Sequence, residues 1–110
     1  MQRRLRLRRN EDFQRLRSEG RKVAHPLLVM VVAPNQCAHN RYGVIASRRL
    51  GNAVARNRAK RRIREAIRHW HPHIPPGHDL LFIARHPVLT CAYPALVDAI
   101  GILLRRANLV

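Results

Sequence analysis

Hydrophobic and polar residues follow one another along the first half of the chain in a pattern that predicts one helix and two strands. The helix is expected from Asn10, a typical N-cap residue, to a stop at Gly20, with acids in its first turn, where the helix dipole favours negative charge. The continuous apolar run of residues 27–33 predicts a buried strand, and residues 42–47 predict another. We expect these two strands to pair as a hairpin, with room for a short extra strand near Val23.

The second half of the chain changes to helical spacing, with one strand between two helices. A long helix is expected from Gly51 or Asn52 to about Trp70, then a strand over residues 79–85, then a last helix that starts within residues 90–94. The resulting order, α-β-β-β-α-β-α, predicts an α+β sandwich in which helices pack on a small four-stranded mixed sheet. The strand–helix–strand unit predicts parallel strands joined by a crossover, whose usual hand is right-handed.

Length and charge indicate a single domain whose partner is a polyanion. The chain has 110 residues, which suits a single domain over 1–110, and residues 1–9 form a basic arm expected to be flexible until it meets an anion. It carries 22 Lys and Arg against 6 Asp and Glu, a net charge of +16, and only Lys22 and Lys60 are not arginines. Such a field attracts polyanions, and arginine pairs with phosphate through two parallel hydrogen bonds.

Apolar runs and cysteines indicate the compartment. No apolar run approaches the ~20 residues that a membrane-spanning helix needs, and no apolar stretch follows the basic N-terminus as in a signal peptide. The two cysteines, Cys37 and Cys91, are too few for a disulfide framework, so we interpret them as reduced thiols. These patterns favour a cytoplasmic protein without a membrane partner.

The long central helix carries the strongest functional signal. One apolar face, which must pack on the sheet, consists of Ala55, Ala59, Ile63, Ala66, Ile67 and Trp70. The opposite face is basic, and its one nearby acid, Glu65, is expected to pair with Arg61 or Arg68. Charged helix faces are usually just solvated, but acids are too scarce here for salt bridges along the face, so we interpret it as a nucleic-acid surface. By its angle, Arg56 falls on the apolar side and is expected to reach around the sheet edge.

Candidate catalytic and metal-binding residues are sparse. The acids form no D-x-D or E-x-x-H grouping, whereas a two-metal nuclease needs convergent carboxylates that hold ions ~4 Å apart. We therefore expect no catalytic residues and no metal held by the protein itself. His69, His71 and His73 alternate at the helix end and leave two interpretations open, a metal site or polar loop residues, and the lack of a nearby cysteine favours the second.

The central helix also contains a recognisable sequence, GNAVARNRAKRRIRE at residues 51–65. It resembles the signature of the bacterial ribonuclease P protein component. Three further segments resemble the same family in order and spacing: RLRRNEDFQRL near the start, RYGVIASRR before the helix and DLLFIAR after it. The resemblance covers about residues 3–107.

This resemblance implies a fold, a partner and an activity. The fold would be an α-β sandwich with a left-handed crossover, against the usual hand. The protein would be the accessory subunit of a ribonucleoprotein endonuclease that removes the 5′ leader from precursor tRNA and leaves a 5′-phosphate. The catalytic RNA would hold the Mg²⁺ ions and carry the chemistry. The protein would need no cofactor of its own and would act as a monomer in a 1:1 complex with that RNA.

The resemblance also implies two sets of site residues. Those that would contact the catalytic RNA, on the long helix and the loop before it, are Arg48, Arg49, Asn52, Arg56, Asn57, Arg58, Lys60, Arg61, Arg62, Arg64 and Arg68. Those that would line a cleft for the single-stranded leader are Phe13, Arg17, Val31, Ser47, Arg85 and His86. Arg17 and Val31 stand where relatives often have aromatic residues, so Arg17 would substitute through guanidinium stacking or a phosphate contact.

Two other classes of function fit the composition. A general RNA-binding structural protein, such as a ribosomal protein, would share the basic helix but would not stimulate cleavage by a catalytic RNA. A DNA-binding regulator would place the long helix in a major groove, but the chain lacks the short turn and second helix of a helix-turn-helix.

Overall fold

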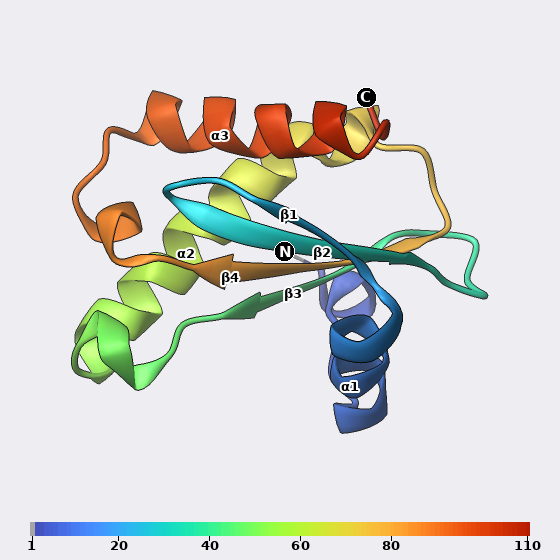
Figure 1. The fold of residues 1–110 in the computed structure, drawn as a ribbon, viewed down its shortest axis with the longest axis horizontal. Coiled ribbons are helices and arrows are strands. Elements are labelled where there is room, and N and C mark those ends of the chain that lie inside the picture. Colours follow the sequence, from blue (N-terminus) through green and yellow to red (C-terminus); the bar gives the residue numbers. More distant parts are fainter. Residues whose placement is uncertain (1) are drawn as a thin grey trace.

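Three α-helices form where the apolar spacing predicts them in the computed structural model, which describes residues 2–110 (Figure 1). They are α1 (Asn10–Glu19), α2 (Ala53–Trp70) and α3 (Tyr93–Arg106). The side chain of Asn52 caps α2 by accepting a hydrogen bond from the Ala55 amide at 2.9 Å. The expected N-cap role of Asn10 is wrong, because Arg9 occupies the cap position and no side chain bonds there.

Four strands form one mixed sheet in the order β1-β2-β4-β3. Their bounds are β1 (Arg21–Ala24), β2 (Leu28–Pro34), β3 (Arg41–Ile45) and β4 (His78–Ala84). The α+β class and the four-stranded mixed sheet are therefore confirmed, and β3 pairs with β4 in parallel, as expected for a crossover through α2. The left-handed path of that crossover stays an expectation from the resemblance.

The expected hairpin of β2 with β3 is wrong, because β4 lies between these two strands and pairs with both. The reason is burial. β4 has an almost wholly apolar interior and is covered on both faces, which suits a central strand. β3 is shorter and contains Arg41 and Gly43, so it takes an edge position, where polar residues are tolerated.

The sheet is covered on both faces, and this explains why its central strands are continuous apolar runs. α2 and α3 lie on one face and α1 on the other (Figure 1). Alternate strand residues serve the two layers: Met30 and Phe82 pack in the core under α2 and α3, whereas Val31 and Leu81 pack in a smaller core with α1. The sheet thus separates two surfaces of the molecule.

The contact of α2 with α3 depends on a glycine. A Cβ atom on Gly101 would lie 2.5 Å from Cζ2 of Trp70, so only glycine allows the indole to pack there. The indole Nε1 also donates a hydrogen bond to the Val97 carbonyl oxygen at 2.9 Å. Trp70 therefore joins the end of α2 to α3.

The N-terminal arm, over the described residues 2–9, is docked on the sheet edge. Leu5 and Leu7 are 8% and 6% exposed, and the Leu7 amide donates to the Tyr42 carbonyl oxygen at 2.8 Å. Arg6 forms a parallel bridge with Tyr42. Leu5 ends a short 3₁₀ turn and packs in the core under α2 and α3, whereas Leu7 packs in the smaller core with α1. The arm therefore crosses the open edge of β3 from one face of the sheet to the other, and the flexibility expected for residues 1–9 stays a prediction.

Candidate nucleic-acid interface

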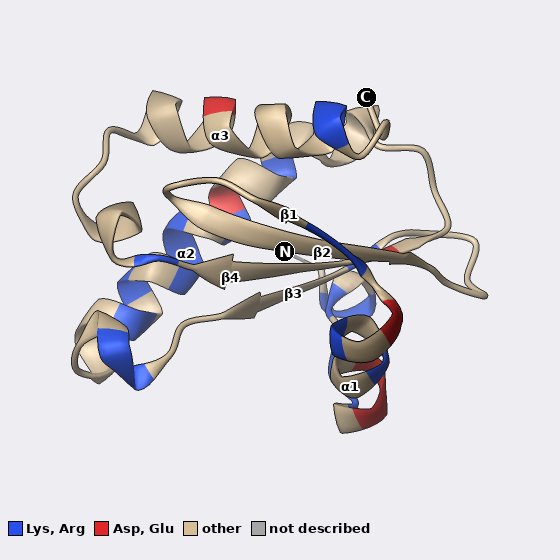
Figure 2. Cartoon of the chain, viewed as in Figure 1, with Lys and Arg blue, Asp and Glu red and all other residues tan. Residues whose placement is uncertain are grey.

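Helix α2 presents a basic face on the side away from the sheet. Its residues Ala59, Ile63 and Ala66 are fully buried, as their spacing predicts, so the opposite side of the helix is left to solvent. The exposed residues of that side that the resemblance assigns to RNA are Asn57, Arg58, Arg61 and Arg68. Lys and Arg follow one another along α2 in Figure 2. The face therefore offers an array of charged donors suited to a polyanion.

The loop before α2 continues this basic surface. A short 3₁₀ turn, Arg48–Leu50, exposes both of its arginines and buries Leu50. Gly51 then takes a φ of 134°, a conformation that favours glycine, and leads into the exposed cap residue Asn52. Because Leu50 anchors the turn in the core, its two arginines extend the row of charges that starts on the helix.

Four basic residues of α2 are half-buried: Arg56, Lys60, Arg62 and Arg64. Arg62 donates hydrogen bonds to the carbonyl oxygens of Val88, at 2.9 Å, and Cys91, so it ties α2 to the segment after β4 instead of extending into solvent. Burial, together with the charge of Arg6 in the arm, lowers the pKa of Arg64. The Nε of Arg56 is buried without a hydrogen-bond partner among residues 2–110.

The single acid of α2 leaves the basic face largely unneutralised. Glu65 pairs with Arg68 at 3.2 Å, one of the two partners expected from the sequence. The two side chains are 55% and 63% exposed, and such surface pairs contribute only ~0–1 kcal/mol. The other arginines of the exposed face take part in none of the ion pairs formed within residues 2–110.

A second candidate surface lies on the opposite face of the sheet, beside α1. Phe13 and Arg17 line a shallow hollow together with Asn10, Gln14 and Ile45. The ring of Phe13 sits over Gly43 of β3, where an added Cβ would lie 2.9 Å from Cε1 of the ring. The absence of a side chain at Gly43 therefore allows the Phe13 ring to pack closely against β3 at the floor of the hollow.

The remaining residues of the expected leader cleft fall into two groups. Ser47, Arg85 and His86 are exposed and follow the ends of β3 and β4. These strands are parallel, so the three residues lie at the same end of the sheet, beyond the carboxyl ends of both strands. Val31 is only 4% exposed and packs beneath α1, so it does not line the hollow that contains Phe13. The structure thus brings Phe13 and Arg17 together but keeps Val31 in the core.

The residues that hold α1 in place were not among those predicted from the sequence. Arg15 of α1 forms an ion pair with Asp79, which is completely buried at the start of β4, and also donates to the Pro34 carbonyl oxygen at 3.1 Å. Arg41 of β3 pairs with the same carboxylate at 2.8 Å. A lone acid at the head of an otherwise apolar strand is the signal that would have pointed to such a partner.

The histidines around the end of α2 pack against aromatic side chains. His71 forms a hydrogen bond through Nδ1 with the Tyr42 hydroxyl at 2.7 Å, while His69 and His73 contact Trp70 edge-on. Within residues 2–110, no three His, Cys, Asp or Glu side chains gather in a way that could hold a metal ion. Nor does the described part of the chain contain a helix long and apolar enough to cross a membrane.

Comparison with known proteins matches nearly the whole chain to one family. A family model described as Ribonuclease P matches residues 1–108. The ribonuclease P protein component of Roseiflexus castenholzii is 46% identical over 111 aligned residues, which span 100% of this chain and 91% of the relative. The solved structure of the Staphylococcus aureus RNase P protein superimposes with a TM-score of 0.85 at 34% identity over 96% of both chains. The RNase P protein from Thermotoga maritima gives a TM-score of 0.82 at 28% identity, over 92% of this chain and 96% of its own.

Proposed function

The chain belongs to the ribonuclease P protein family, and from that premise we propose that it assists a catalytic RNA in removing the 5′ leader of precursor tRNA. Membership makes it the protein component of a ribonucleoprotein endoribonuclease, and tRNA processing and RNA binding follow from it. The observation that carries the finer proposal is the basic face of α2, where a row of exposed arginines has one weakly paired acid. The protein would act as a monomer in a 1:1 complex with the RNA in the cytoplasm.

The catalytic RNA would bind along α2 and the turn before it. The residues placed to reach it are Arg48, Arg49, Asn52, Asn57, Arg58, Arg61 and Arg68, all exposed. Arginines would contact phosphates, and Asn57 would donate or accept a hydrogen bond at the RNA surface. Lys60 and Arg64 are half-buried and would contribute at the margins, while Arg56 would contribute if RNA contact satisfies its buried Nε. Arg62 would support the interface by holding α2 in place, not by binding RNA.

The single-stranded leader would lie in the hollow beside α1. The half-buried ring of Phe13 offers a base a stacking surface that needs no particular sequence. Arg17, exposed in the next turn of the same helix, would stack by its guanidinium plane or bind a phosphate. Ser47, Arg85 and His86 would bind the backbone of the strand where it leaves the hollow.

The chemistry would belong to the RNA, which would hold the Mg²⁺ ions. The carboxylates of the protein do not fit a two-metal site, because Asp79 is buried between arginines and Glu65 is exposed on another element. The protein would supply positive charge between the catalytic RNA and the precursor tRNA, which otherwise repel each other, and a binding site for the leader. Both effects would reduce the Mg²⁺ concentration that cleavage needs.

Reconstitution tests this function directly. The protein is mixed with a bacterial ribonuclease P RNA at low Mg²⁺, and 5′ processing of precursor tRNA is followed on gels. We expect the protein to accelerate release of the leader and to leave a 5′-phosphate on the tRNA. A rate equal to that of the RNA alone would overturn the proposal and favour a structural RNA-binding protein.

Variants of the two surfaces separate their roles. Replacing Arg58 and Arg61 by Ala should weaken assembly with the catalytic RNA, whereas Arg105→Ala, which removes an exposed charge on α3, should leave assembly nearly unchanged. Phe13→Ala should weaken binding of precursor tRNA to the complex by about 5- to 150-fold, the loss of one stacked base at ~1–3 kcal/mol. Mature tRNA, which lacks the leader, should bind almost as before, and Gln14→Ala in the same hollow is the matched control.

A further inference from the structure

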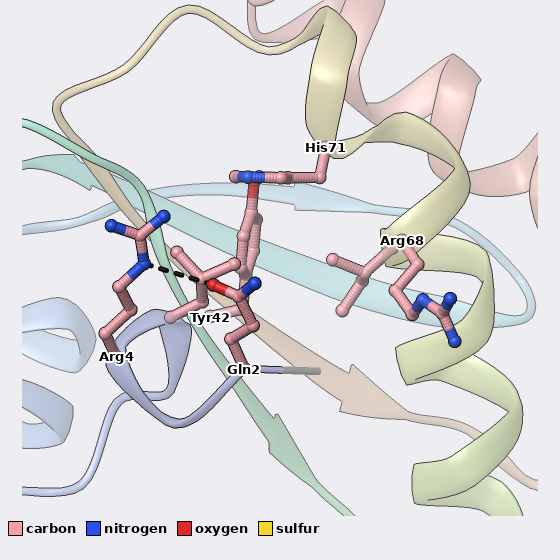
Figure 3. Close-up of a pocket in the computed structure, with 7 residues that line it drawn as sticks. Gln2, Arg4, Tyr42, Arg68 and His71 are labelled. Carbon is pink, nitrogen blue, oxygen red and sulfur yellow. Dashed lines mark hydrogen bonds between the residues drawn. The ribbon is translucent and has the colours of Figure 1, made fainter.

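A cavity between the N-terminal arm and the end of α2 shares only Arg68 with these surfaces (Figure 3). It has a volume of about 500 Å³, within the ~300–1,000 Å³ range of small-ligand sites. The arm and α2 form its two walls, and β3 supplies Tyr42 between them. We call it the arm pocket; the lining residues that matter for its chemistry are Arg4, Leu5, Tyr42, Ile67, Arg68 and His71.

The inner surface of the arm pocket is apolar and aromatic. Leu5 of the arm and Ile67 of α2 are 8% and 1% exposed, and Tyr42 is 2% exposed. The rings of Tyr42 and His71 meet edge to face, with centroids 5.5 Å apart and an interplanar angle of 83°. These buried side chains close the floor of the cavity, so a flat apolar group entering it would rest on them.

One polar pair lies within the arm pocket. The Tyr42 hydroxyl and Nδ1 of His71 form a hydrogen bond 2.7 Å long. Burial raises the pKa of Tyr42 to about 12, so the phenol stays protonated. Because Nδ1 is occupied by this bond, Nε2 is the ring nitrogen of His71 left to bond an incoming group.

The rim of the arm pocket is positive on both walls. Figure 3 shows Arg4 on the arm and Arg68 on α2 on either side of the Tyr42–His71 pair. Both arginines are exposed, and a hydrogen bond from Arg4 Nε to the Gln2 side chain at 3.1 Å gives the arm arginine one preferred position. Arg6 and Arg64 do not line the cavity but add positive charge to the same two walls, the arm and α2, while Arg68 also pairs with the exposed Glu65. This excess of positive charge would attract an anionic group to the rim.

We propose that the arm pocket binds one unpaired nucleotide of an RNA, with the base inside and the phosphate at the rim. The base would rest on Leu5 and Ile67 and form a hydrogen bond with Nε2 of His71, while Arg4 and Arg68 would hold the phosphate. An apolar interior under a cationic rim fits a nucleotide better than an acidic peptide, whose carboxylates bring no flat apolar group. The proposal rests on the proposed function only in taking the partner to be RNA, since the residues inside the cavity belong to neither surface described above.

Nuclear magnetic resonance titration of the full chain tests the arm pocket. The probes are the four 5′-mononucleotides AMP, CMP, GMP and UMP and, separately, inorganic phosphate at matched ionic strength. We expect at least one nucleotide to shift the amide signals of Leu5, Ile67 and His71, and phosphate alone to shift them much less. Equal shifts with phosphate, or shifts confined to Phe13 and Arg17, would overturn the proposal.

Charge-matched variants separate the cavity from the general positive field. Replacing Arg4 and Arg68 by Ala should weaken nucleotide binding at these signals about tenfold, as expected for loss of charge-assisted contacts at an exposed rim. Replacing Arg9 and Arg105 by Ala removes the same charge from exposed positions outside the cavity and should change the affinity by less than about twofold. Equal losses in the two double variants would contradict the proposal.

His71 provides the test of the interior. His71→Ala removes this hydrogen-bonding ring and should abolish the preference for nucleotide over phosphate, whereas His73→Ala, at an exposed histidine two residues away, should keep it. The conservative Tyr42→Phe variant retains the buried ring but frees Nδ1 of His71, and should reduce nucleotide affinity without unfolding the protein. If the protein stimulates cleavage but binds no nucleotide, only the proposed nucleotide site is refuted. If it binds nucleotide but does not stimulate cleavage, only the proposed function is refuted.

Discussion

At the scale of single residues, Asp79 determines where α1 sits. Its carboxylate is fully buried and accepts hydrogen bonds from Arg41 Nε at 2.9 Å, from the side-chain amide Nδ2 of Asn35 at 2.9 Å and from Arg15. The hydrogen bond to Asp79 raises the pKa of Arg41. One side chain thus connects α1, β3, β4 and the loop after β2. The hollow that contains Phe13 depends on this network, because its outer wall is α1.

Asp79→Asn should lower the free energy of unfolding by about 3 kcal/mol, measured by urea denaturation. Removing one member of a buried ion pair usually costs ~3–5 kcal/mol, and we expect the lower end because Arg15 and Arg41 are 31% and 23% exposed and can reach water. Glu65→Gln removes an exposed carboxylate and is the matched control, with an expected change below about 1 kcal/mol. Equal effects of the two substitutions would show that the buried network contributes little.

His25 makes the stability of the turn between β1 and β2 depend on pH. Its Nδ1 accepts a hydrogen bond from the Leu27 amide at 3.0 Å, and burial, with the charges of Arg106 and Arg85, lowers its pKa below 6.5. The unfolded chain therefore takes up the proton first as the pH falls, so this contribution to stability is present above pH 6.5 and is lost below it. We expect the melting temperature to fall between pH 7.5 and pH 5, as followed by circular dichroism.

His25→Asn should reduce that pH dependence, because the Asn side-chain oxygen accepts the Leu27 amide bond at every pH in this range. His73→Asn, at an exposed position, is the control and should keep the behaviour of the unmodified protein. A pH profile that is the same with and without His25 would refute this assignment.

At the scale of elements, α2 combines two roles on opposite sides of one helix, packing on the core and presenting arginines to a partner. Its apolar stripe and Arg62 attach it to the sheet, to α3 and to the segment after β4, while its outer arginines remain free for a partner. Arg61 and Arg62 are neighbours in sequence but lie about 100° apart around the helix axis, so only the first faces outward. The same residue type therefore serves binding at one position and folding at the next.

Alanine substitutions at these two neighbours should have opposite consequences. Arg62→Ala should lower the free energy of unfolding by about 2 kcal/mol, because two charge-assisted hydrogen bonds to backbone carbonyl oxygens are lost. Arg61→Ala should change stability by less than about 0.5 kcal/mol but weaken binding to the catalytic RNA about fivefold, equivalent to ~1 kcal/mol. Denaturation and filter-binding measurements on both variants check the pair, and loss of RNA affinity only in Arg62→Ala would contradict it.

At the scale of the whole molecule, the net charge of +16 is divided unevenly between the two faces of the sheet. Three of the six acids belong to α1, on the side of the hollow, whereas α2 carries six arginines and Lys60 against one acid (Figure 2). A densely charged, structured RNA therefore suits the α2 side. The α1 side has fewer net charges and one aromatic ring, which suits a flexible single strand.

Binding of the catalytic RNA should depend steeply on salt. Neutralising about six to ten phosphates predicts a slope of about −4 to −9 in a plot of log affinity against log salt concentration. Replacing both Arg58 and Arg61 by Ala should make the slope shallower by about 1.5–2, because two phosphate contacts release fewer counterions. Affinity that is independent of salt would exclude the phosphate-based interface.

The local pattern of residues was sufficient to predict the helices, the strands and the basic face of α2. Amphipathic spacing places Ala59 and Ile63 inward and Arg58 and Arg61 outward whatever the rest of the chain does, because both sets follow from the geometry of one helix. The start of α2 at Asn52 is a local signal of the same kind, whereas the parallel orientation of β3 and β4 follows from the strand–helix–strand order. The family resemblance depends on this segment as well.

Only the tertiary structure decided which strands are neighbours and which arginines are free. β4 separates β2 from β3 because β2 and β4, the two strands with the longest buried apolar runs, take the two central positions, a competition among segments that no single segment reveals. Arg62 is occupied because the Val88 and Cys91 carbonyl oxygens arrive from a distant part of the chain. The arm pocket exists because the open edge of β3 captures the arm. Sequence spacing determines what one element presents, whereas packing between distant elements determines what remains accessible.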